Sequence, residues 1–248
     1  MTKLRKHPML DIHKIKNFDK LIPNSTLSNV MDNELRDVIR ELDKRNVKIS
    51  KQLKKYIIIR LVTIVESYLQ NNIAWLVDDY DLNVERLFQG SEIPIPIKYF
   101  KEIQKKDFTK GKIIAANFNF QNSSEINKVF SNLLGLNFFD TLHDWIRFGI
   151  KNNIVPESEI HLIDNWDKFQ EIFSLRNTLV HTLQTPHKIR KNADYFETLW
   201  DTTWHFINCA YNMSEDVMWY RKGKIKNKKA IEFFKTQTKK WNQNYSKS

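Results

Sequence analysis

Apolar residues recur every three or four positions along most of the 248-residue chain. That spacing builds one apolar face along an α-helix, and the helix breakers Gly and Pro number only five and six. We therefore predict an all-α protein, a helical bundle without a strand ladder. The predicted helices cover residues 27–46, about 51–80, 138–152, 156–182 and 192–221.

Individual residues mark where some of these helices begin. Ser50 directly precedes the apolar repeat at 51–80, and serine is a preferred N-cap because its hydroxyl accepts from a free backbone N–H. Pro156 suits a first-turn position, where its missing N–H has no partner to lose. Pro94 and Pro96 break the pattern, and we expect residues 81–135 to be an elaboration of short helical pieces inserted between the core helices.

The chain divides into three predicted segments: a basic N-terminal arm (1–20), a helical domain (21–220) and a basic C-terminal tail (221–248). Its one cysteine, Cys209, excludes a disulfide framework or a thiolate zinc site and favours a reduced, cytoplasmic setting. The most apolar segment is interrupted by Arg60 and Glu66 and is too short for a membrane span. We expect a cytoplasmic protein without a membrane partner.

The formal charge of +11 is concentrated at the C-terminal end. Residues 221–248 hold ten Lys or Arg against one acid, Glu232, which leaves this segment with +9 of the total. Nucleic acid is the partner class that such a segment suits, although a solvated tail carries the same charge. Apolar residues from Ile231 to Trp241 have helical spacing, while the composition fits disorder equally well. The lysines expected to contact nucleic acid are Lys222, Lys224, Lys226, Lys228 and Lys229.

An arginine interrupts the apolar face of the predicted 156–182 helix. On a helical wheel Arg176 lies in the middle of a stripe of aliphatic and aromatic residues, with Asn177 and His181 on its polar flank. Burying a guanidinium without a partner is costly, so the position implies an acceptor. Glu66 has the matching place in the apolar face of the 51–80 helix. We predict a Glu66–Arg176 pair, which either serves a site or only fixes helix register.

Arg176, Asn177 and His181 supply the groups that cleavage of RNA without a metal ion requires. Histidine moves protons to or from the ribose 2′-oxygen and the leaving 5′-oxygen near neutral pH. Arginine stabilises charge on the pentavalent phosphorus, and the asparagine amide orients the phosphate. His181 follows Arg176 by five residues, about 7.5 Å along a helix.

The motif Arg-Asn-x-x-x-His, after an earlier helix with Glu-Ser in "IVESYL", resembles the HEPN superfamily. The resemblance implies an all-α, metal-independent endoribonuclease that needs no cofactor. It implies Arg176, Asn177 and His181 as catalytic residues, with Glu66 as a supporting acid. It also implies a homodimer that joins two motifs at one cleft, in a toxin–antitoxin or antiviral defence system with a possible partner protein. The alternative is a non-catalytic HEPN-like module that binds RNA or a nucleotide, or serves in assembly.

Three further patterns suggest chemistry less specifically. The run "DDYD" at 78–81 lacks nearby histidines, so we expect solvated rather than metal-binding carboxylates. His205 and Cys209 lie one helical turn apart, but no third residue that would orient a thiol nucleophile is apparent. The aromatic residues of the 192–221 helix, Trp219 among them, have the spacing of packed residues rather than of base-stacking platforms.

Overall fold

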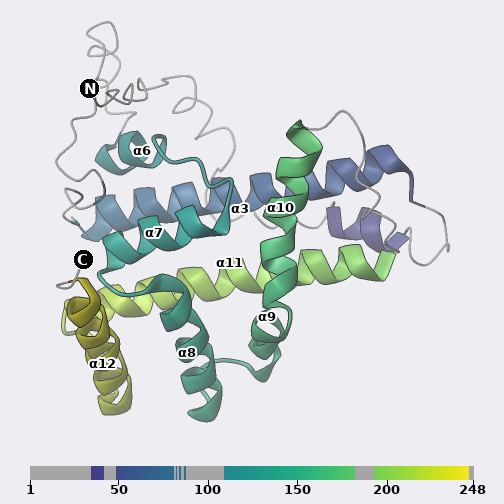
Figure 1. The fold of residues 1–248 in the computed structure, drawn as a ribbon. Helices are drawn as coiled ribbons and strands as arrows, with labels where there is room; N and C mark the ends of the chain where they lie inside the picture. The colour runs from purple at the N-terminus through teal and green to yellow at the C-terminus, as the bar shows by residue number, and fades with distance from the viewer. Residues whose placement is uncertain are drawn as a thin grey trace, which may run out of the picture.

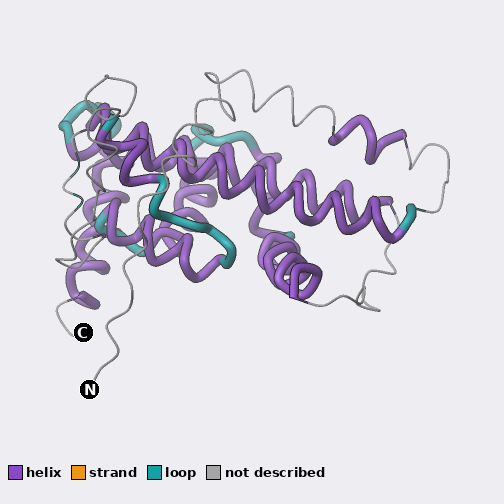
Figure 2. Tube along the Cα trace, turned by 90° about the horizontal axis from the view of Figure 1, so that it is seen from above, coloured by secondary structure: helices purple, strands orange, loops and turns teal. Residues whose placement is uncertain are grey.

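The computed structural model describes residues 35–41, 49–80, 82, 84, 87, 109–181 and 193–245. Within that part every regular element is a helix, which confirms the predicted all-α class (Figures 1 and 2). The predicted basic arm at 1–20 lies outside the described residues. The main elements are α3 (Lys51–Tyr80), α6 (Lys110–Ala115), α7 (Ser123–Leu134), α8 (Phe138–Lys151), the 3₁₀-helix η2 (Glu157–Glu159), α9 (Ile160–Asp164), α10 (Trp166–His181), α11 (Ala193–Arg221) and α12 (Lys228–Tyr245).

The two longest helices, α3 and α11, lie side by side along the length of the molecule (Figure 1). Their C-terminal ends meet, since Trp75 near the end of α3 stacks on Tyr211 of α11 with ring centroids 5.0 Å apart. The helix α10 crosses this pair steeply, and Phe169 of α10 stacks on Phe206 of α11 at 4.1 Å. Fully buried aliphatic and aromatic side chains from these three helices form one continuous core.

Helix α3 begins at its predicted N-cap. The Ser50 hydroxyl accepts from the backbone N–H of Leu53 at 3.1 Å, and the helix covers the predicted 51–80. Helices α8 and α11 also match their predicted ranges within one residue. In each case the sequence carries both an apolar repeat and a residue that suits the helix end, so two local signals agree.

The single helix predicted over 156–182 is wrong: η2, α9 and α10 occupy this range, with a break at Asn165. The backbone of Asn165 leaves the helical region at φ −114° and ψ 24°. Its side-chain amide donates to the carbonyl of His161 at 3.1 Å, and its own carbonyl accepts from Lys168 and Phe169. Asparagine competes with the helix for backbone partners in this way, so the apolar repeat continues although the helix does not.

Helices α6 and α7 fall in the range predicted as an elaboration, yet they share the main core. Phe120 and Phe130 are fully buried there. Gly111 lets α6 approach α3 closely, because a Cβ atom at this position would lie 2.2 Å from the carbonyl oxygen of Ala74. The Gly111 N–H also donates to the Asp78 carboxylate at 2.7 Å. Part of the range predicted as an insertion is therefore integral to the fold.

The basic C-terminal segment forms the helix α12, so the amphipathic interpretation of this segment is the correct one. Its buried edge includes Phe234, which is 2% exposed, and Phe233, which stacks on Phe148 of α8 at 4.9 Å. Asn227 caps the helix by accepting from the backbone N–H of Lys229 at 3.0 Å. Apolar contacts with α8 hold α12 against the bundle and leave all of its lysines exposed.

Candidate active site and nucleic-acid interface

Arg176 lies on the apolar face of α10, with the buried residues Ile172 and Phe173 in the preceding turn on either side of it. Leu175 and Leu179 are buried, Arg176 is half-buried, and Val180 is 52% exposed. Val180, which belongs to the predicted stripe, is therefore open to solvent, although Leu179 beside it in the last turn of α10 is buried. At a half-buried position the aliphatic stem of an arginine packs on apolar neighbours while the guanidinium reaches polar groups.

The guanidinium of Arg176 takes amide oxygens as its hydrogen-bond acceptors. Its Nη1 donates to Gln121 Oε1 at 3.0 Å and to Asn177 Oδ1 at 3.3 Å. The predicted bond to Glu66 is not among these contacts. Gln121 lies in the turn between α6 and α7, 55 residues away in sequence, and no sequence pattern marked it as a partner. We call Arg176, Asn177 and Gln121 the Arg176 cluster.

Amide acceptors leave the charge of an arginine uncancelled. A carboxylate would neutralise the guanidinium, whereas Gln121 and Asn177 fix its orientation and keep its full positive charge. Both amides accept from the same nitrogen, Nη1, so among the described residues the other N–H groups of the fork have no acceptor and can meet an anion. The Arg176 cluster thus has the composition expected of a phosphate contact.

The other predicted site residues are His181, on the same helix as Arg176, and Glu66, on α3. His181 is the last residue of α10, and its side chain lies outside the described residues. Asn177 and His181 are four residues apart, a spacing that puts their Cβ atoms on one face of the helix. Glu66 is half-buried on α3, where Val62 and Leu69 are buried. Its supporting role stays a prediction.

A second polar cluster joins η2 to α11. The Glu159 carboxylate accepts, through the same oxygen, from His205 Nδ1 at 2.8 Å and from Cys209 Sγ at 3.0 Å. We call these three residues the Glu159 cluster. Sequence reasoning set His205 and Cys209 aside because no third residue was apparent, and Glu159 is that third residue. It escaped notice because η2 lies 46 residues before His205.

The Glu159 cluster holds its thiol in an unreactive state. Burial raises the pKa of Cys209, and the hydrogen bond to Glu159 and its charge raise that pKa further. Burial alone would also raise the pKa of Glu159, but the donors His205 and Cys209 and the charge of His205 outweigh it and lower that pKa. A protonated thiol that donates to a carboxylate is a weak nucleophile. The cluster is therefore closed to thiol catalysis.

The five predicted nucleic-acid lysines are exposed at the junction of α11 and α12. Two of them contact other described residues. Lys222 Nζ lies 4.1 Å from the ring centroid of Tyr80 and donates to the carbonyl of Asp79 at 3.3 Å. Lys229 Nζ donates to Asn152 Oδ1 at 3.2 Å. Both keep their charge, since a ring face and neutral oxygens are their partners, so all five remain available to a polyanion.

Two further observations limit the chemistry of the described residues. Among them, no group of three His, Cys, Asp or Glu side chains is arranged to hold a metal ion. None of the described helices is long and apolar enough to cross a membrane.

Comparison with known proteins adds no relative. No family model matches the chain, and neither a curated protein nor a solved structure matches it. The resemblance to the HEPN superfamily accordingly rests on the motif Arg-Asn-x-x-x-His and on the helical pattern alone.

Proposed function

We propose that the protein is a metal-independent endoribonuclease of HEPN type. The observation that supports this most strongly is the Arg176 cluster, in which two amides orient an arginine without neutralising it. The motif histidine, His181, ends the same helix. A guanidinium, an amide and an imidazole on one helix supply charge stabilisation, phosphate orientation and proton transfer.

In the proposed reaction the ribose 2′-oxygen attacks the adjacent phosphorus and the 5′-oxygen of the next nucleotide leaves. His181 exchanges protons with these two oxygens, and Arg176 stabilises the charge that builds up on the phosphate. Asn177 orients the phosphate, and Gln121 positions the arginine. The products carry a 2′,3′-cyclic phosphate and a 5′-hydroxyl. Two copies of the chain, joined about a two-fold axis, would contribute one motif each to the cleft.

The basic junction of α11 and α12 supports RNA as the substrate. It presents Lys224 and Lys226 next to the first turn of α12, where Lys228 adds a cation to the positive end of the helix dipole. In Figure 1 this junction lies at one end of the molecule, away from α10. An RNA that reaches both regions must extend along the bundle.

Incubation of the purified chain with total RNA in EDTA tests this function. We expect cleavage by the wild type and its loss in His181→Ala and in Arg176→Lys, which keeps the charge but not the planar fork. Val180→Ala is the matched control, because it alters the exposed neighbour of His181 without touching the motif. RNA binding without cleavage in the wild type would favour a non-catalytic RNA-binding module. Cleavage retained by His181→Ala would refute the assigned site.

A further inference from the structure

The end of α11 is a Schellman turn that places a lysine beside a tryptophan. Gly223 adopts φ +65°, and its N–H donates to the carbonyl of Tyr220 at 3.0 Å. The next N–H, from Lys224, donates back to the carbonyl of Trp219 at 2.8 Å. In this motif the two residues joined by the hydrogen bond that spans six residues usually make an apolar contact. Here the pair is a lysine and a tryptophan instead.

Trp219 is exposed and lies close to Tyr80. Its side chain is 41% exposed, and while burial raises the pKa of Tyr80, the nearby Trp219 acts in the opposite direction. Tyr80 packs edge-on against Trp75 at 5.2 Å, and Trp75 stacks on Tyr211. The indole therefore lies near a layer of rings from α3 and α11 while keeping much of its surface exposed. The prediction that Trp219 is merely a packed residue does not account for this exposure.

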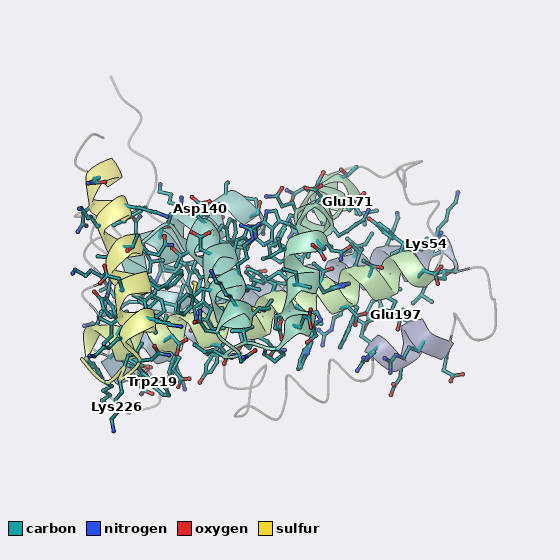
Figure 3. All side chains as sticks on the ribbon, turned by 90° about the horizontal axis from the view of Figure 1, so that it is seen from below. Lys54, Asp140, Glu171, Glu197, Trp219 and Lys226 are labelled. Atoms are coloured by element: carbon teal, nitrogen blue, oxygen red, sulfur yellow. The ribbon has the colours of Figure 1, made fainter. Side chains whose placement is uncertain are left out.

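The charge around this indole is positive. Residues 221–229 hold six Lys or Arg and no acid. Figure 3 shows Trp219 and Lys226 together at one corner of the molecule, with Lys54 and Glu197 at the far end. Two carboxylates, Glu215 and Asp79, are near enough to help burial raise the pKa of Tyr80. They reduce the local charge without reversing it.

We propose that Trp219, together with Lys224 and Lys226, is a binding platform for single-stranded RNA. A nucleobase stacks on the indole, and the lysines contact the phosphates on either side. An unpaired base offers its ring face to an aromatic side chain, while a duplex hides that face. The choice of RNA over DNA rests on the proposed function. A membrane surface fits less well, because among the described residues of this corner Trp219 is the one large exposed ring and Lys222 to Lys229 are almost all polar.

Binding of a fluorescent 12-nucleotide 2′-O-methyl uridine RNA by the full chain tests the platform, because this probe lacks the hydroxyl that cleavage needs. We expect Trp219→Ala to weaken binding by about tenfold to a hundredfold and Trp219→Phe to weaken it much less. Lys224→Ala should lower the slope of log affinity against log salt by about 0.7. Tyr56→Ala is the control for an exposed aromatic residue elsewhere, and Lys51→Ala for an exposed lysine.

Equal affinity of wild type, Trp219→Ala and Trp219→Phe would overturn the platform and leave only electrostatic binding. Equal affinity for a duplex of the same length, or binding only to phosphatidylserine vesicles, would overturn it too. Trp219→Ala and Trp219→Phe are both compared with wild type for helix content, so a folding defect is separated from a binding defect. Failure of the platform can be told apart from failure of the proposed function, since loss of RNA cleavage in His181→Ala and Arg176→Lys tests residues that the platform does not include.

Discussion

The Arg176 cluster and the Glu159 cluster both join a helix to a distant turn through hydrogen bonds, but their chemistry is opposite. In the Glu159 cluster one carboxylate accepts hydrogen bonds from a thiol and an imidazole. In the Arg176 cluster two neutral amide oxygens accept hydrogen bonds from a guanidinium. The first arrangement holds its reactive groups in structural hydrogen bonds, whereas the second does not neutralise the charge of its arginine.

The comparison shows that residue type alone is a poor guide to a site. Cysteine, histidine and glutamate are the usual residues of nucleophilic catalysis, yet here Cys209 is 1% exposed and its pKa is raised. Glutamine is not a usual catalytic residue, yet Gln121 and Asn177 accept from Arg176 where a carboxylate would neutralise it. The partner of each group decides its role, and the partner is set by the fold.

Substitutions at His181 and Cys209 should separate the two clusters by the rate of RNA cleavage. His181→Ala should lower the rate of RNA cleavage by about 10²- to 10⁴-fold, because proton transfer contributes on that scale. Cys209→Ser keeps a donor to Glu159 and should cleave at the wild-type rate. Initial rates on one RNA under single-turnover conditions measure both. Loss of activity in Cys209→Ser with an unchanged fold would move the active site to the Glu159 cluster.

Gln121→Glu gives the Arg176 cluster a carboxylate acceptor, as in the Glu159 cluster. The substitution is isosteric and gives Arg176 a carboxylate acceptor, so the free energy of unfolding should stay level or rise. The guanidinium would then be neutralised, and cleavage should fall by about tenfold to a hundredfold. Denaturant unfolding and cleavage rates are measured on the same preparation, with Gln121→Ala beside it. Unchanged cleavage in Gln121→Glu would show that the charge of Arg176 is not used.

The Glu159 cluster predicts a stability effect that depends on pH. At neutral pH, Glu159→Gln should lower the free energy of unfolding by about 1–2 kcal/mol, because the amide is a weaker acceptor for His205 and Cys209. The pKa of Glu159 is lowered in the folded protein. Its contribution is therefore present above about pH 4.3, the ordinary glutamate value, and is lost as the pH falls through the folded pKa. Urea unfolding of wild type and Glu159→Gln across this pH range measures the difference in their free energies of unfolding. A difference that does not change with pH would contradict the prediction.

Much of the fold was predictable because local signals agree. Ser50 and the apolar repeat behind it fixed α3, and the same kind of repeat fixed α8 and α11. The break at Asn165 was missed because the apolar period continues through it. Gln121 and Glu159 were missed for a different reason. Each meets its partner across 46 to 55 residues, and no periodic pattern carries information about such a contact.

The Cys209 thiol should not react with a thiol reagent in the folded protein. Iodoacetamide at pH 8 should leave Cys209 unmodified in the folded protein, because the thiol is buried and its pKa is raised. In 6 M guanidinium chloride the same thiol should react fully, which serves as the control. Mass spectrometry of the intact chain counts the adducts. Rapid modification of the folded protein would mean that the Glu159 cluster opens to solvent.

In the proposed reaction, the Arg176 cluster and His181 cleave RNA through the RNA's own 2′-hydroxyl. Mass spectrometry of the products from a short defined RNA, digested in EDTA, identifies the ends that the cleavage leaves. We expect a 2′,3′-cyclic phosphate on one fragment and a 5′-hydroxyl on the other, with no cleavage where the 2′-hydroxyl is replaced by hydrogen. Fragments with a 5′-phosphate and a 3′-hydroxyl, or cleavage next to a 2′-deoxy residue, would contradict it.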